Sequence, residues 1–201
     1  MSNPFAKMGT DISATSRRGQ HFCYQPDKTP ARYIARVKNV KFLDGQGGQF
    51  YITEFEVIAT DARLKDGRPR YRAGSSVAQV SKLRKDIIET VLGNIKSFCL
   101  AAVNSKADAA GRDRPPESII DGDFTMATTG EKQPLKDAIV YVEAGHKFKK
   151  DKTDFTTVVY FAPEDVDKDN WLAPAAKAPG AAPMAEDKPA ANDDSDDDDL
   201  F

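Results

Sequence analysis

The chain has 201 residues, 40% of them hydrophobic, and its 29 basic and 31 acidic residues leave a net charge of −2 at pH 7. This length and composition predict one domain of ordinary size with tails, and the absence of a run of about eighteen apolar residues excludes a membrane-spanning helix. Residues 1–19 have no apolar stretch behind a basic start, which argues against a secretory signal and favours a cytoplasmic protein.

The charge is distributed unevenly along the chain. From Ala173 onward there are eight acidic and two basic residues, a net charge of −6, which leaves residues 1–172 at +4. Six of the last ten residues are aspartates, and like charges at this density cannot bury apolar surface, so we expect a disordered linker and acidic tail over residues 173–201. The apolar end of this tail could enter a small pocket with a basic rim on a partner protein. The alternative, a tail that only increases solubility, would not need an apolar end. The predicted partner-binding residues are Asp196, Asp197, Asp198, Asp199, Leu200 and Phe201.

Residues 1–30 are mostly polar, and we interpret them as an N-terminal arm with one strand candidate near residues 20–25. Cys23 and Cys99 are far apart in the sequence and form no C-x-x-C motif, so we expect reduced thiols. A zinc site would have to combine them with the two histidines of the chain, but the close ligand pairs typical of zinc sites are missing. We therefore expect neither a metal ion nor a cofactor.

The first strong strand candidate spans residues 31–43. Alternate residues up to Val37 form an apolar face, and Arg36 and Lys38 lie opposite. The alternation slips by one residue before Val40, which predicts a bulge or bend of the kind that turns a long strand around a small barrel.

A tight hairpin is predicted at residues 44–49, which read D-G-Q-G-G-Q. The returning strand, residues 49–58, alternates between two faces. The face that contains Tyr51 and Phe55 is the better core face, which directs Phe50 outward. If the strand phase is shifted by one residue, Tyr51 points outward and Phe50 points to the core, so both orientations stay open.

Residues 61–74 break the periodicity and form the most basic segment of the chain, with glycines and a proline that are typical of a loop. A short strand at residues 75–80 follows. Ser81 is a candidate N-cap for a helix whose apolar residues recur at helical spacing as far as Ala102, with a break predicted near Gly93. A linker with two prolines comes next.

Two further strands, residues 138–144 and 155–162, flank a turn with four lysines and Phe148. Three strands, a helix and two more strands is the element order of an OB-fold, a five-stranded barrel with its helix between the third and fourth strands. The predicted fold class is therefore mainly β with one or two helices. We expect an OB-fold barrel over residues 31–172, between the N-terminal arm and the disordered acidic tail.

In an OB-fold, the outer face of strands two and three and the loops after strands one and four receive single-stranded nucleic acid. Cations bind the phosphates and aromatic rings stack on unpaired bases, and neither contact needs a particular base sequence. For each basic loop taken alone, a solvated loop is the alternative interpretation. The predicted nucleic-acid-binding residues are Arg36, Lys38, Phe50, Arg63, Lys65, Arg68, Arg70, Tyr71, Arg72, Lys147, Phe148, Lys149, Lys150 and Lys152.

With a basic OB-like body, an Ala/Pro-rich linker and the ending D-D-S-D-D-D-D-L-F, the chain resembles phage-type and bacterial single-stranded DNA-binding proteins. Leu200 stands where bacterial members have a proline, and the long segments 61–74 and 105–137 fit the phage-type members better. The resemblance implies protection of single-stranded DNA in replication, recombination and repair, and recruitment of partners such as DNA polymerase through the tail. For a phage-encoded chain it implies the host cytoplasm. Monomer and homodimer both stay open.

The sequence contains no nucleotide-binding, metalloprotease or serine-hydrolase motif, so we do not expect an enzyme. Asp121 and Asp123, with Glu131 or Asp137, could hold magnesium as in a nuclease, but Asp-Gly-Asp is above all typical of turns. Two other binding functions stay open. One is an adaptor or inhibitor whose acidic tail mimics nucleic acid and whose body ignores oligonucleotides, and the other is a protein that binds single-stranded RNA.

Overall fold

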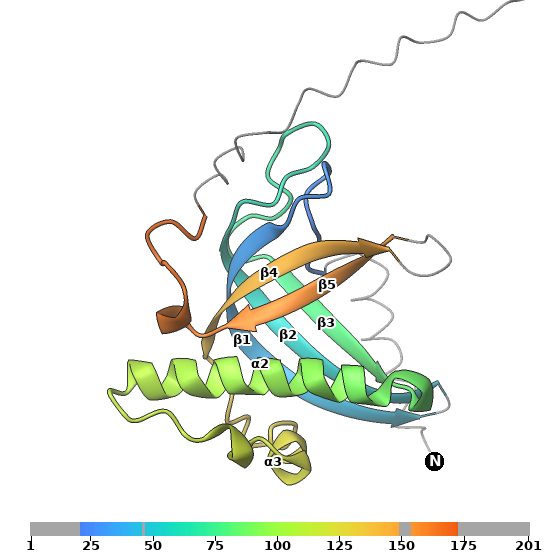
Figure 1. Ribbon diagram of the computed structural model, residues 1–201, viewed down its shortest axis with the longest axis vertical. Helices are drawn as coiled ribbons and strands as arrows, with labels where there is room; N and C mark the ends of the chain where they lie inside the picture. Colours follow the sequence, from blue (N-terminus) through green and yellow to red (C-terminus); the bar gives the residue numbers. More distant parts are fainter. Residues whose placement is uncertain (1–20, 46, 149–153, 173–201) are drawn as a thin grey trace, which may run out of the picture.

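The computed structural model describes residues 21–45, 47–148 and 154–172. Within these ranges five antiparallel strands form one sheet in the order β3-β2-β1-β4-β5, and a long helix lies across its lower end in Figure 1. The described residues also contain three short 3-10 helices, at Lys85–Ile87, Glu117–Ile119 and Pro163–Asp165. The strands are β1 (Ala31–Gly45), β2 (Gly48–Thr60), β3 (Ser76–Leu83), β4 (Ile139–Phe148) and β5 (Asp154–Phe161), and the helices are α2 (Ile88–Ala109) and α3 (Gly122–Ala127).

The predicted mainly β fold is confirmed, with α2 between β3 and β4 as the element order requires. The sheet is open, because in the described part of the chain no ladder of hydrogen bonds joins β3 to β5. None of the helices described there is long and apolar enough to cross a membrane.

Two irregularities shift the register between β1 and β2. The first leaves Ile58 of β2 without a partner on β1, and the second leaves Lys38 of β1 without a partner on β2. An extra residue reverses the face to which the following side chains point. Val37 before the bulge and Val40 after it are therefore both buried in the core, whereas Lys41 points away from it. The bulge predicted from the slip before Val40 is confirmed.

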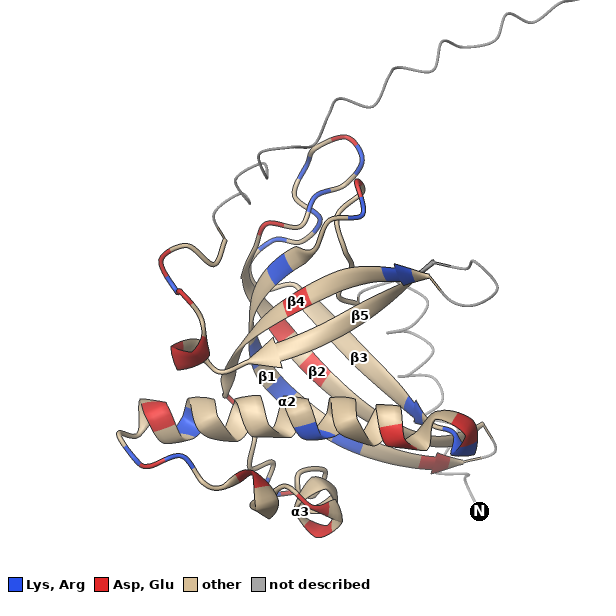
Figure 2. Ribbon diagram, viewed as in Figure 1, with Lys and Arg blue, Asp and Glu red and all other residues tan. Residues whose placement is uncertain are grey.

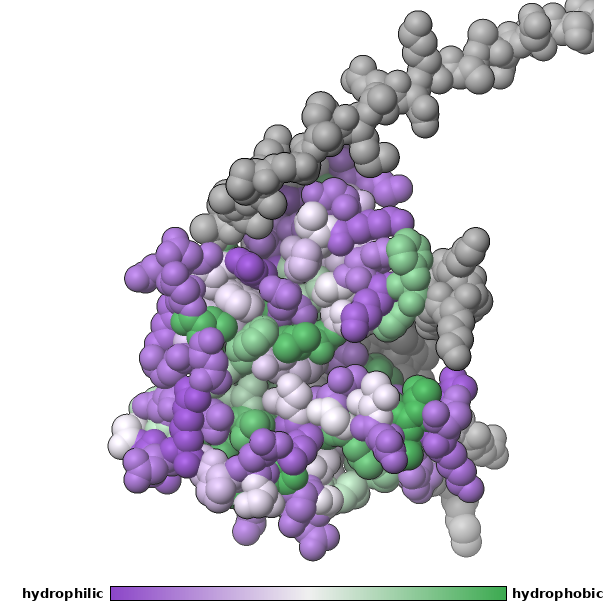
Figure 3. All heavy atoms as spheres, in the orientation of Figure 1, coloured by the Kyte–Doolittle hydropathy of each residue, from purple (hydrophilic) through white to green (hydrophobic). Residues whose placement is uncertain are grey.

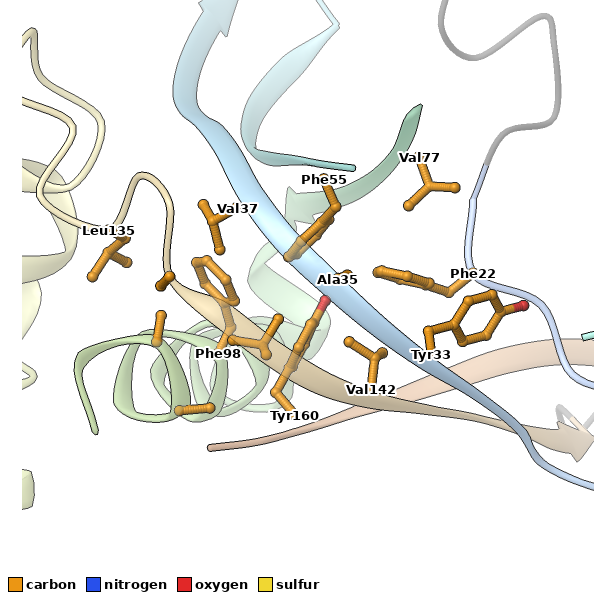
Figure 4. Close-up of a cluster of buried hydrophobic side chains, with 14 of the residues drawn as sticks. Phe22, Tyr33, Ala35, Val37, Phe55, Val77, Phe98, Leu135, Val142 and Tyr160 are labelled. Carbon is orange, nitrogen blue, oxygen red and sulfur yellow. The ribbon is translucent and has the colours of Figure 1, made fainter. Parts of the chain in front are cut away.

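Rings from the sheet and from α2 fill the core (Figure 4). The ring centre of Phe55 on β2 lies 6.1 Å from that of Tyr160 on β5, although β1 and β4 separate these two strands. In a flat sheet, three strand spacings of about 4.8 Å would hold the rings roughly 14 Å apart, so the sheet is strongly coiled. Phe98 of α2 contacts both rings, at 5.7 Å and 5.3 Å, and covers the open side of the core.

The predicted core face of β2 is confirmed. Tyr51 is buried, and its hydroxyl lies 2.8 Å from that of Thr128 and 3.6 Å from the sulfur of Cys99. Thr53 and Phe55 are buried on the same face. Because successive side chains of a strand point to opposite faces, Phe50 points away from the core, which resolves the choice between Phe50 and Tyr51.

The helix begins later and runs further than the spacing predicts. β3 remains paired with β2 as far as Leu83, so Ser81 is a strand residue and the prediction of an N-cap there is wrong. α2 passes Gly93 without a break. Val91 and Ile95 on either side of this glycine are buried against the sheet, so tertiary packing outweighs the low helix propensity of glycine.

A double-mutant cycle between Phe55→Leu and Tyr160→Leu tests the coiling of the sheet. Because the two rings are in contact, we expect urea unfolding to give a coupling free energy of about 0.5–1.5 kcal/mol. The matched control uses Phe161→Leu, the next residue on β5, whose ring packs against Trp171 at 5.6 Å. A coupling of zero between Phe55 and Tyr160, or an equal coupling between Phe55 and Phe161, would contradict a coiled sheet.

Candidate nucleic-acid interface

The loop between β2 and β3 folds back on itself and presents its cations to solvent. Leu64 donates its backbone N–H to the carbonyl of Arg68 at 2.8 Å. Gly67 makes the turn at φ +81°, in the left-handed region that favours glycine. The carboxylate of Asp61 fixes the base of the loop by accepting a backbone N–H of β1 at 2.7 Å. Arg68 is 76% exposed and pairs with Asp66 at 2.6 Å, so the ion pair lies at the surface.

Residues 21–25, here called the strap, form no strand, contrary to the prediction, and cross one end of the core. Phe22 is buried, with its ring 4.9 Å from that of Tyr33 and 5.1 Å from that of Phe55. The hydroxyl of Tyr33 accepts the N–H of Cys23 at 3.1 Å and donates to the carbonyl of Cys23 at 2.6 Å. The core of the body therefore extends into the segment that the sequence assigns to an arm.

Tyr71 fastens the basic loop to the strap. Its hydroxyl donates to the carbonyl of His21 at 2.7 Å, and its ring lies 6.2 Å from that of Tyr33. The guanidinium of Arg70 lies 5.9 Å from the centre of the Tyr71 ring. Burial, and secondly the charge of Arg70, lower the pKa of His21. Tyr71 is thus half-buried and held on several sides, and it offers a base less ring surface than the sequence suggests.

An aromatic cluster occupies the tip of β4. Phe148 is 60% exposed, and its ring centre lies 4.6 Å from that of His146. The ring of His146 lies 4.8 Å from that of Tyr24 in the strap. Lys28 places its Nζ 4.9 Å from the centre of the Phe148 ring, a cation–π contact. A positive charge and an exposed ring side by side are the pair of groups that unpaired nucleotides need.

These segments meet at one end of the sheet, here called the loop end and made of residues 21–30, 61–75 and 145–148. β1 begins at this end, where Ala31 pairs with Ala144, and β2 ends there. Figure 2 shows Lys and Arg gathered in the upper loop and at the tip of β4, and the surface over the upper end is mainly hydrophilic in Figure 3. Seven cations stand against three aspartates: Lys28, Arg63, Lys65, Arg68, Arg70, Arg72 and Lys147 against Asp27, Asp61 and Asp66.

A second basic strip lies on the outer face, the side of β1, β2 and β3 that points away from the core. Lys38 donates to the carboxylate of Glu56 at 3.0 Å, and Arg36 lies 4.0 Å from the same carboxylate. Lys41 donates to Glu54 at 2.9 Å. The hydrogen bond and charge of Lys38 lower the pKa of Glu56, so this carboxylate is ionised at neutral pH.

Aromatic and aliphatic side chains continue the outer face toward β3. Phe50 is half-buried, and the Nζ of Lys82, its partner on β3, lies 5.4 Å from the centre of the Phe50 ring. Val80 is 44% exposed, whereas Ile52 between Phe50 and Glu54 is 5% exposed. Phe50 and Val80 are therefore the apolar groups that a ligand on this face can reach.

The predicted site residues fall on two surfaces and partly outside the described residues. Lys149, Lys150, Lys152 and the partner-binding residues from Asp196 to Phe201 lie outside them. The sequence reasoning missed Lys41, although the slip before Val40 is a signal that moves it outward. It also missed Lys28, which left no signal because its contact with Phe148 exists only in the folded chain. The loop end holds Arg63, Lys65, Arg68, Arg70, Tyr71, Arg72, Lys147 and Phe148, and the outer face holds Arg36, Lys38 and Phe50.

Within the described ranges, no three His, Cys, Asp or Glu side chains are placed to hold a metal ion. Cys99 lies in the core, where burial raises the pKa of its thiol to about 11. The carboxylate of Asp121 accepts the N–H of Phe124 at 2.8 Å and so acts as the N-cap of α3.

No family model, curated protein or solved structure matches the chain.

The change Tyr71→Phe tests the fastening of the strap. Loss of the hydrogen bond to His21 removes about 1 kcal/mol, so the strap opens about five times more often. We expect a thiol reagent to label Cys23, which is buried in the strap, faster by this factor, with Cys99 in the core as the internal reference. Tyr141→Phe, whose ring packs against Trp171, is the matched control. An unchanged ratio of Cys23 to Cys99 labelling in Tyr71→Phe would show that Tyr71 does not hold the strap.

Proposed function

We propose that the chain is a non-enzymatic, sequence-tolerant single-stranded DNA-binding protein that protects single strands in replication, recombination and repair. The observation that carries this proposal is the loop end, where three segments distant in sequence bring seven cations to the end of the sheet that carries the exposed ring of Phe148, with Lys28 4.9 Å from the centre of that ring. Cations neutralise phosphates whatever the sequence, and a ring stacks on any unpaired base. A duplex hides the faces of its bases, so an exposed ring favours the unpaired form.

The outer face extends this surface along β1, β2 and β3. Phe50 beside Lys82 repeats the combination of ring and cation, and Arg36 and Lys38 lie between this pair and the loop end. In this proposal the DNA strand crosses the loop end and continues along the outer face, which is the ligand face of an OB-fold. The strand order, the place of α2 between β3 and β4, and the coiling of the sheet support an OB-fold whose barrel is open between β3 and β5.

Trp171 supports a role for the acidic tail beside this surface. Its indole N–H donates to the carbonyl of Tyr33 at 3.2 Å, and the guanidinium of Arg32 lies 5.1 Å from its ring centre. Both partners belong to the start of β1, so the described part of the chain ends close to the loop end. In this proposal the six terminal aspartates compete with DNA for the cations of the body. The ending Leu200-Phe201 recruits replication or recombination proteins such as DNA polymerase.

A fluorescent dT oligomer, titrated as a single strand and as its duplex with dA at several salt concentrations, tests the proposal. We expect tighter binding of the single strand, with the logarithm of its affinity falling by about 0.7 per bound phosphate for each tenfold rise in salt. Preference for the duplex would contradict the proposal. Degradation of the probe would indicate a nuclease, absence of binding an adaptor, and preference for an rU oligomer an RNA-binding protein.

Phe148→Ala in the same titration locates the stacking surface. A lost stack of about 1–3 kcal/mol should weaken binding of dT roughly 5- to 150-fold. The change should leave the stability almost unaltered, because Phe148 is 60% exposed. Leu92→Ala is the matched control, since Leu92 is 47% exposed on α2, which crosses the lower end of the sheet in Figure 1, opposite the loop end. Equal affinities of the two variants would remove Phe148 from the interface.

A further inference from the structure

We propose that Glu54 and Glu56 are built-in competitors of the DNA phosphates on the outer face, and that they limit both the affinity and the salt dependence of binding. This inference rests on the proposed function of the chain. It concerns the cations of β1, which already have anionic partners before any ligand arrives.

The register of the sheet holds these ion pairs together. Arg36 and Glu56 are direct cross-strand partners. Asn39 and Glu54 are also direct partners, and Asn39 donates its side-chain N–H to the Glu54 carboxylate at 3.1 Å. Lys38, the extra residue of the bulge, reaches the carboxylate of Glu56. The backbone ladder therefore keeps Arg36 beside Glu56 and Asn39 beside Glu54. Lys38 and Lys41 flank these pairs and reach the same two carboxylates with their side chains.

The two carboxylates also stand in the path of a ligand. Along β2, Phe50, Glu54 and Glu56 point to the same outer face, with the cations of β1 on one side and Val80 of β3 on the other. Successive outward residues of a strand are about 7 Å apart, so the carboxylates form a short anionic row between the cations and the apolar groups. A DNA strand whose bases contact Phe50 and whose phosphates contact the cations of β1 must break the contacts between these carboxylates and the cations.

Breaking these ion pairs changes the net number of counterions that are released when DNA binds. A phosphate that meets a solvated lysine releases condensed counterions, which is the main source of salt dependence. A phosphate that takes Lys38 or Lys41 from a glutamate leaves that glutamate exposed, and the carboxylate then attracts a cation from solution. The counterion taken up by the protein offsets the counterion released by the DNA. On the outer face, Lys38 and Lys41 therefore exchange one anion for another, whereas at the loop end seven cations share three aspartates, so most of these cations bind a phosphate without such an exchange.

Glu54→Gln and Glu56→Gln, made separately, test this inference in the titration with the dT oligomer. Glutamine keeps the shape and a hydrogen-bond acceptor but removes the charge. Because exposed ion pairs hold their cations only weakly, each change should tighten binding about 1.5- to 5-fold at low salt. The slope of log affinity against log salt should steepen by up to about 0.7 for each additional phosphate that the protein neutralises.

Glu117→Gln is the matched control. Glu117 pairs with Lys96 of α2 at 2.8 Å, and its substitution changes the net charge by the same amount, but it lies away from the outer face. Circular dichroism identifies any variant that fails to fold, in which case the other glutamate still provides the test. If the unaltered protein binds dT and the folded Glu54 and Glu56 variants match Glu117→Gln in affinity and slope, the inference is wrong and the proposed function stands. If the unaltered protein and all variants fail to bind dT, both are wrong.

Discussion

The extra residue at Lys38 decides which side chains of β1 face the core and which face solvent. Without it, strict alternation would place Lys41 inside and Val40 outside, since Arg36 already points outward. The bulge buries Val40 and brings the cations of β1 to one face. A bulge also bends its strand, and the bend allows the coiling by which Phe55 of β2 meets Tyr160 of β5 across the core.

This architecture produces two basic surfaces that differ in their ratio of cations to carboxylates. The loop end has an excess of cations because its acids are few, and the carboxylate of Asp61 is occupied in fixing the loop to β1. On the outer face, Glu54 and Glu56 neutralise much of the charge of β1. In the proposed function, the loop end supplies long-range attraction for a polyanion, and the outer face supplies contacts that form and break by exchange.

The sequence predicts the strands well, because alternation of apolar and polar residues is a local signal that the sheet preserves. The slip before Val40 predicted the bulge, and the burial of Tyr51 followed from the same period. The boundary between β3 and α2 could not be predicted, since pairing with β2 holds Ser81 in the ladder although its side chain suits a helix cap. Closure of the barrel, which the element order favoured, is absent between β3 and β5 in the described part of the chain.

For the candidate site, the sequence identified the cations but not how the fold uses them. Arg36 and Lys38 appear as exposed cations in the strand pattern, and only the register with β2 shows that Glu56 pairs with both. Tyr71 lies in a charged loop, a context that predicts an exposed ring, but its hydroxyl holds the strap instead. Phe148 is the predicted ring that the fold leaves most exposed. Lys28, which lies over this ring, is about 120 residues away in the sequence, and local patterns carry no information across such a separation.

The most direct test of the account is a map of backbone amide shifts by NMR during titration of the whole chain with a dT oligomer. We expect the shifts to gather at residues 61–72 and 145–148 and along the outer face of β1, β2 and β3. Shifts confined to α2 and α3, or no shifts at saturating oligomer, would contradict the claim that the loop end and the outer face form one surface for single-stranded DNA.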